Sequence, residues 1–141
     1  MMFSKELIKS IEKTKILFQK GEYKKALKIS TVLVQNHSDN YFLHNMHGYI
    51  LLSLNDYKTS KKFFLNCIDL NKNFAEAYYL LGIANTNLND LESSLENFLS
   101  AIKLNPNLED AHNKIISILT SFKPKNNHEH PYVFVNYMVD K

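Results

Sequence analysis

Few side chains in this sequence have the types and spacing that metal binding requires. His44 and His47 lie three residues apart, a spacing that on a helix brings two imidazoles within reach of one metal ion. His128-Glu129-His130 is a second candidate, close to the C-terminal end. Neither pair has a third potential ligand at a suitable sequence spacing, although zinc sites use at least three protein ligands. We therefore expect two packed histidines and a solvated His-X-His, with no metal and no cofactor.

Candidate nucleophiles are equally few. Cys67 is the single cysteine, so no intrachain disulfide can form. It occupies a position where helix packing needs a small buried residue, which predicts an inert thiol. The sequence contains no HExxH, GxSxG or CxxC motif, and its three glycines are too far apart to form a phosphate-binding loop. We expect no catalytic residue and a protein that is not an enzyme.

The amino-acid composition excludes several fold classes and several kinds of binding partner. Of 141 residues, 45% are hydrophobic and 22% are charged, as in soluble globular proteins. Three Gly and three Pro are too few for the turns of a sandwich or barrel, so an all-helical fold is predicted. All 17 basic residues are Lys, whereas nucleic-acid sites favour the forked Arg side chain. No apolar run is long enough for a membrane span or a signal peptide. We expect a cytoplasmic protein that binds neither nucleic acid nor membrane.

An internal repeat organises the chain. Gly48 is followed one period later by Gly82, and Asn55-Asp56-Tyr57 aligns with Asn89-Asp90-Leu91 at the same interval. In each unit two blocks of helically spaced apolar residues flank a polar turn, which predicts a helical hairpin. Asn73 and Asn107 have the spacing of capping residues at the start of first helices. The predicted units are residues 7–40, 41–74 and 75–108, followed by a capping helix over 109–121.

These units resemble the tetratricopeptide repeat family. The third unit carries the fullest match, in the family's aromatic, small and proline positions: Tyr78, Leu81, Gly82, Ser94, Phe98, Ala101 and Pro106. The second keeps Gly48, Ser60 and Phe64, whereas the first has Thr14 in place of Gly and Ser30 in place of the aromatic residue. The resemblance implies a right-handed solenoid of helical hairpins over residues 1–122. It also implies that each helical glycine faces a small residue of the second helix.

The resemblance further implies a concave groove, lined by the first helices, that binds a partner protein or peptide. The side chains expected to contact the partner are Phe42, Asn45, Tyr49, Leu52, Tyr79, Ile83 and Asn87. An extended peptide or a helix would bury the apolar ones, with the asparagines as hydrogen-bonding groups. Two alternatives stay open: a small solenoid tolerates exposed aromatics, or the chain covers its own groove.

One subclass of the family grips chaperone tails through a clamp of Lys, Asn and Arg around a terminal carboxylate. The corresponding positions here hold Ile11, Lys15, Met46, Glu76 and Leu80. The clamp is therefore absent, and Glu76 would repel a carboxylate.

Residues 123–141 are predicted to be a linker and an extended tail, because Tyr132–Val139 is rich in β-branched and aromatic residues. We expect 131–141 to dock on the solenoid, with pairing to another chain or the start of a further domain as alternatives. The leading interpretation is an interaction module or scaffold. The alternatives are the N-terminal module of a larger enzyme, for example a transferase, and a self-associating scaffold.

Overall fold

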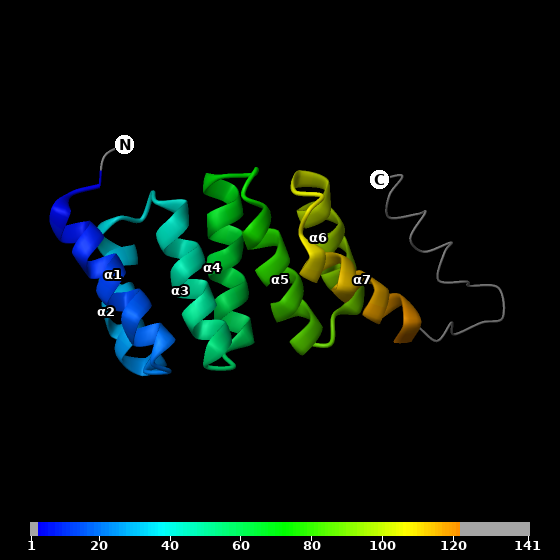
Figure 1. Ribbon diagram of the computed structural model, residues 1–141, viewed down its shortest axis with the longest axis horizontal. Coiled ribbons are helices and arrows are strands. Elements are labelled where there is room, and N and C mark those ends of the chain that lie inside the picture. Colours follow the sequence, from blue (N-terminus) through cyan, green and yellow to red (C-terminus); the bar gives the residue numbers. More distant parts are fainter. Residues whose placement is uncertain (1–2, 122–141) are drawn as a thin grey trace.

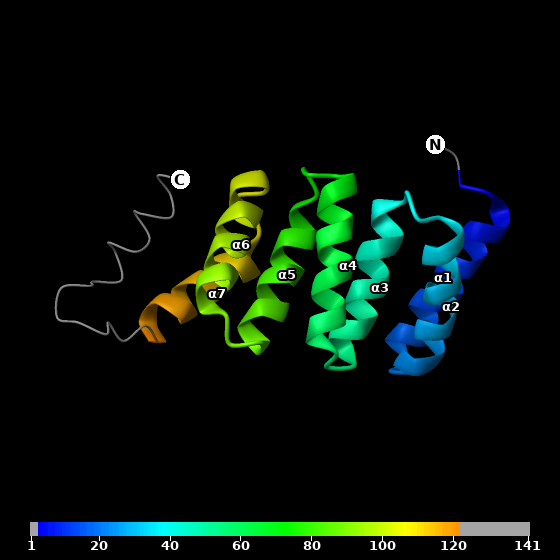
Figure 2. The same cartoon turned by 180° about the vertical axis from the view of Figure 1, so that it is seen from behind.

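The computed structural model describes residues 3–121, which form seven helices and no strand. Neighbours in sequence are neighbours in space, so the helices follow one another along the long axis, and the view from behind shows the same order (Figure 1, Figure 2). The helices are α1 Lys5–Gln19, α2 Tyr23–Asn36, α3 Tyr41–Ser53, α4 Tyr57–Leu70, α5 Ala75–Asn87, α6 Leu91–Leu104 and α7 Glu109–Ser121. The predicted all-helical hairpin architecture is confirmed. The predicted linker and tail, with its docking segment and His128 and His130, lie outside the described residues.

The turn inside each hairpin has the same backbone conformation, which explains its recurrence in the sequence. Gly21, Asn55 and Asn89 occupy the left-handed region, with φ of 76°, 62° and 62°. Glycine and asparagine are the residues that enter this region at least cost. The chain therefore reverses at the same point of every unit.

Hydrogen bonds close these turns, and in the second and third hairpins an aspartate also caps the helix that follows. After α3 the N–H of Asn55 donates to the carbonyl of Leu52 at 3.0 Å, and the N–H of Asp56 donates to that of Leu51 at 2.9 Å. This pair of bonds satisfies carbonyls that the helix end leaves free. The Asp56 carboxylate then accepts from the N–H of Thr59 and caps α4.

The predicted capping role of Asn73 is wrong. Helix α5 begins at Ala75 and its N-cap is Phe74, which has no side chain able to accept a hydrogen bond. The asparagine two residues earlier acts instead: the Asn71 side chain accepts from the N–H of Asn73 at 3.1 Å. Asn105 accepts from Asn107 in the same way, at 3.2 Å, before α7. These asparagines shape the loop between hairpins rather than the helix end.

The helical glycines accommodate a phenylalanine ring. A Cβ on Gly48 would lie 2.7 Å from the Phe64 ring, and one on Gly82 would lie 2.6 Å from the Phe98 ring. The predicted small neighbour is also present, since the Ser94 hydroxyl donates to the Gly82 carbonyl at 2.8 Å. Gly82 thus faces a small residue as expected, and its absent side chain also leaves room for an aromatic ring.

In the first hairpin the sizes of the two facing residues are reversed. Thr14 replaces the glycine and Ser30 replaces the phenylalanine, and both side chains are buried. A larger residue on α1 is thus matched by a smaller one on α2. His47 of α3 hydrogen-bonds to the Ser30 hydroxyl at 2.7 Å, on the side of α2 that meets the second hairpin.

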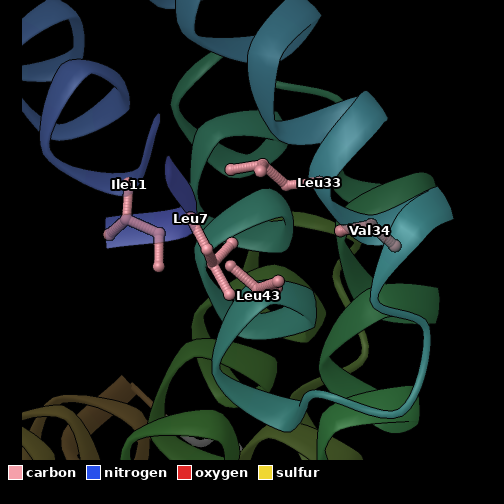
Figure 3. Packing of buried hydrophobic residues seen from close by; sticks show 5 residues of the cluster. All are labelled: Leu7, Ile11, Leu33, Val34 and Leu43. Carbon is pink, nitrogen blue, oxygen red and sulfur yellow. The ribbon is translucent and has the colours of Figure 1, made fainter. Parts of the chain in front are cut away.

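The apolar core runs along the whole row of helices. One cluster, shown in Figure 3, joins α1, α2 and α3 through Leu7, Ile11, Leu33, Val34 and Leu43. A second joins α3, α4 and α5, and a third joins α6 to α7. Helix α7 buries Ala111, Ile115 and Ile118 against α6, as its apolar stripe predicts. Because every cluster spans a boundary between one hairpin and the next helix along the chain, each hairpin depends on its neighbours for burial.

Candidate partner-binding groove

Two adjacent pockets form a hollow over the first helices of the hairpins. The first has a volume of about 310 Å³ and is lined by Thr14, Lys15, Phe18, Gln19, Phe42, Asn45, Met46, Tyr49, Ile50 and Glu76. The second has a volume of about 600 Å³ and is lined by Tyr49, Asn73, Phe74, Ala75, Glu76, Tyr79, Leu80, Leu104, Asn105 and Leu108. Tyr49 and Glu76 line both, so the two pockets meet at these residues. Together they are called the groove below.

The structure brings together four of the seven side chains that the sequence predicts for partner contact. Phe42, Asn45 and Tyr49 line the first pocket, and Tyr49 and Tyr79 line the second. The other three line neither pocket. They are Leu52, which is buried in the core, Ile83, which packs against two core clusters, and Asn87, whose amide donates to the carbonyl of Ile83.

Several lining residues were not predicted as contacts, although one signal was available. Glu76 stands one repeat after Phe42, at the same position of the unit, and joins the two pockets. Phe74 and Leu108 are also separated by one repeat, and both come from the loops between hairpins. The register could have found all three, but the assumption that only first helices line the surface excluded the two loop residues, and Glu76 of α5 was not among the predicted contacts.

Aromatic rings pack against one another at the first pocket, with their planes tilted. The rings of Phe18 and Tyr49 have centroids 4.9 Å apart, and Phe18 also contacts Tyr23 at 5.1 Å. The Lys15 ammonium lies 5.5 Å from the centroid of the Phe42 ring, a cation–π arrangement. Tyr49 is nevertheless 42% exposed. A large aromatic face, held by neighbouring helices, is thus open to contact.

A polar pair lies at the junction of the pockets. The Asn45 amide Nδ2 donates to Oε1 of Glu76 at 3.3 Å, which ties α3 to α5. Asn45 is only 4% exposed, and its Oδ1 has no hydrogen-bond partner. Since an unpaired buried acceptor is unfavourable, the junction favours a ligand that brings a donor.

The pKa of Tyr79 is shifted by its surroundings in the second pocket. Burial raises the pKa of its phenol above the usual value, and the nearby Asp110 carboxylate and Tyr49 raise it further. Its ring also packs against Phe98, with centroids 5.8 Å apart. The phenol therefore stays neutral near physiological pH and can act as a hydrogen-bonding group.

The two histidines of α3 are engaged in packing contacts. Nε2 of His44 donates to the carbonyl of Ser38 at 2.7 Å, and Nδ1 of His47 hydrogen-bonds to Ser30. Both rings contact Phe63. Within residues 3–121 no three His, Cys, Asp or Glu side chains converge as metal ligands, and no helix there is long and apolar enough to cross a membrane.

Cys67 is expected to resist thiol reagents as long as the protein is folded. It is completely buried, and burial, assisted by the Glu76 charge, raises the pKa of its thiol to about 12. Because the thiolate is the reactive form, labelling by a disulfide reagent at neutral pH should be negligible in buffer and complete in denaturant. Rapid labelling of the folded protein would contradict the burial of this side chain.

The comparisons with known proteins agree with this architecture. A family model described as tetratricopeptide repeat matches residues 43–74 and 75–108, the second and third hairpins. No curated protein sequence matches the chain.

Solved structures share the fold at low sequence identity. The first tetratricopeptide repeat domain of Spaghetti (RPAP3), bound to an HSP90 peptide, is 22% identical with a TM-score of 0.80, over 85% of this chain and 95% of that one. The second such domain of human RPAP3, bound to an HSP70 peptide, is 22% identical with a TM-score of 0.74, over 79% and 92%. The Yersinia enterocolitica secretion chaperone SycD, in complex with a peptide of the translocator YopD, is 12% identical with a TM-score of 0.76, over 82% and 94%.

Repeat register, hairpin geometry, family match and structural neighbours thus converge. The second and third hairpins are tetratricopeptide repeats, and the seven helices of residues 3–121 are consistent with about three and a half such repeats.

Proposed function

We propose that this protein is a non-catalytic interaction module that binds a peptide segment of a partner protein in the groove. The neighbours with printed peptide complexes bind peptides of HSP90, HSP70 and YopD. Their likeness supports the general role of a protein-interaction module, and the lining of the groove supports the place of binding.

The observation that carries the proposal is the combination at the junction of the pockets. An exposed aromatic ring, Tyr49, stands beside a buried acceptor without a partner, Oδ1 of Asn45. An extended peptide satisfies both, because its side chains bury apolar surface while its backbone N–H groups donate hydrogen bonds. Rigid aromatic side chains at the centre of an interface commonly dominate its binding energy.

Replacing Tyr49 with alanine is expected to weaken partner binding by at least about tenfold, since truncating a central aromatic anchor typically costs roughly 2 kcal/mol or more. A partner would be captured from an extract of the source cells, identified by mass spectrometry, purified and titrated against each variant. Circular dichroism of the Tyr49→Ala variant should show unchanged helicity, because the ring is 42% exposed.

The matched control removes two exposed apolar side chains from second helices, Val32 of α2 and Leu65 of α4, by substitution with alanine. This double variant should bind within about twofold of the parent, since neither side chain lines the groove. Equal loss in both variants, or no loss in Tyr49→Ala, would place binding on another surface.

A further inference from the structure

Charge is distributed unevenly along the groove. Lys15, the cation of the first pocket, lies over the Phe42 ring at the α1 end. Glu76 is the charged residue that lines the second pocket, and Asp110 acts electrostatically on Tyr79 in the same pocket. The α5–α7 end is therefore acidic and aromatic, and the lining of the second pocket contains no cation.

Two acceptors, the Glu76 carboxylate and Oδ1 of Asn45, lie where the two pockets meet. A carboxylate can only accept hydrogen bonds, so the side of the Asn45 amide that meets Glu76 must be Nδ2. That orientation turns Oδ1 of Asn45 away from Glu76, buried and without a partner. An acceptor pair of this kind favours a ligand with several donors over one with acceptors.

The aromatic lining adds a second preference. Tyr49, Phe74 and Tyr79 all line the pocket that contains Glu76. Aromatic faces attract cations, and a guanidinium also stacks on them because it is planar and weakly hydrated. A carboxylate ligand would instead meet the like charges of Glu76 and Asp110.

We propose that the groove selects a basic peptide segment, with an arginine side chain of the partner at the junction of the two pockets, stacked on the tyrosines and donating to Glu76 and Oδ1 of Asn45. The inference rests on the proposed function and specifies the chemistry of the partner. Lys15 at the opposite end favours one direction of the segment, with its basic side chain toward α5 and α7. Acidic segments are disfavoured by repulsion at Glu76.

Three libraries of short fluorescent peptides test this selection. Each peptide is acetylated and amidated, so that no terminal charge contributes, and its flanks are mixtures of Ser, Gly, Leu and Phe. The libraries differ only in the central residue, which is Arg, Gln or Glu. Fluorescence anisotropy with the full chain should show binding to the Arg library about tenfold tighter than to the Gln library, with the Glu library weakest. Added salt should reduce the difference, because the Glu76 and Asp110 carboxylates are exposed and their charges are screened.

Glu76→Gln is the diagnostic variant, because glutamine keeps an acceptor for Nδ2 of Asn45 while losing the charge. The preference for Arg over Gln should fall to within about twofold in this variant. Glu96→Gln, an exposed change on α6 outside both pockets, should keep the full preference.

Each alternative outcome overturns the inference. Equal binding of the Arg and Gln libraries, a preference retained in Glu76→Gln, or no binding of any library would each do so. Preferential binding of the Gln or Glu library that is lost in Tyr49→Ala would reject the basic partner while leaving groove binding intact. A native partner whose binding is insensitive to Tyr49→Ala would instead reject the proposed function itself.

Discussion

Replacing Gly82 with leucine is expected to lower the free energy of unfolding by about 3 kcal/mol, the upper part of the range for overpacked cores. Even the first atom of the new side chain, its Cβ, would lie 2.6 Å from Cε1 and 2.8 Å from Cδ1 of Phe98. Phe98 is completely buried, so its ring has no free space to enter. Helices α5 and α6 would have to separate, which would also break the hydrogen bond from Ser94 to the Gly82 carbonyl.

Gly82→Ala isolates the contact with the ring. In an exposed helix this change would stabilise by about 1 kcal/mol, because alanine has the higher helix propensity. Here we expect destabilisation, measured by urea unfolding followed by circular dichroism. In combination with Phe98→Leu, Gly82→Ala should cost clearly less than it does alone, because leucine leaves room for the methyl group. Additive effects of the two changes, or a stabilising Gly82→Ala, would show that the ring does not occupy the space above Gly82.

Acidification is expected to destabilise the protein through His47. Burial lowers the pKa of this imidazole from 6.5 to about 4, and the neighbouring His44 contributes in the same direction. The ring lies between the Ser30 hydroxyl, at 2.7 Å, and the edge-on Phe63 ring, with centroids 4.4 Å apart. The folded state therefore holds His47 neutral at a pH where the unfolded chain already binds a proton.

The sign of the effect follows from this difference. Above pH 6.5 the imidazole is neutral in both states, and its contribution to stability is fully present. As the pH falls from 6.5 to about 4, only the unfolded state gains a proton, so up to about 3 kcal/mol of stability is lost. Urea unfolding at a series of pH values would measure the loss.

His47→Leu should remove this part of the pH dependence. Leu81 occupies the corresponding position of the third repeat, and the Ser30 hydroxyl retains a hydrogen bond to the carbonyl of Leu27. The matched control is His112→Gln on α7, where the imidazole is exposed. If His47→Leu loses stability between pH 6.5 and 4 as steeply as the parent, His47 is not held neutral by the fold.

The repeat register predicted most of the secondary structure because the signals involved are local. Apolar spacing within each block predicts a helix, and Asn55 and Asn89 mark turns that need a left-handed residue. The capping prediction at Asn73 failed for a local reason too. Asparagine forms turns as readily as it caps helices, and spacing alone does not distinguish the two.

The candidate contact residues were predicted only in part. The resemblance to the family placed Phe42, Asn45, Tyr49 and Tyr79 on one surface, and in the structure all four line the groove. It placed Leu52 there as well, although this side chain belongs to the core between the second and third hairpins. Equivalent positions of a repeat differ in burial, because each hairpin meets a different neighbour.

The sequence by itself determined the repeat and the helical hairpins, since both depend on periodicity along the chain. The resemblance to the tetratricopeptide repeat family implied the inner surface on which binding is proposed. Only the tertiary structure decided which side chains of different repeats meet. Phe98 fills the space above Gly82, His47 bonds to Ser30, and Asn45 bonds to Glu76. These contacts depend on how each hairpin is rotated against the next. That rotation results from the packing of whole side chains, and no local pattern in the sequence encodes it.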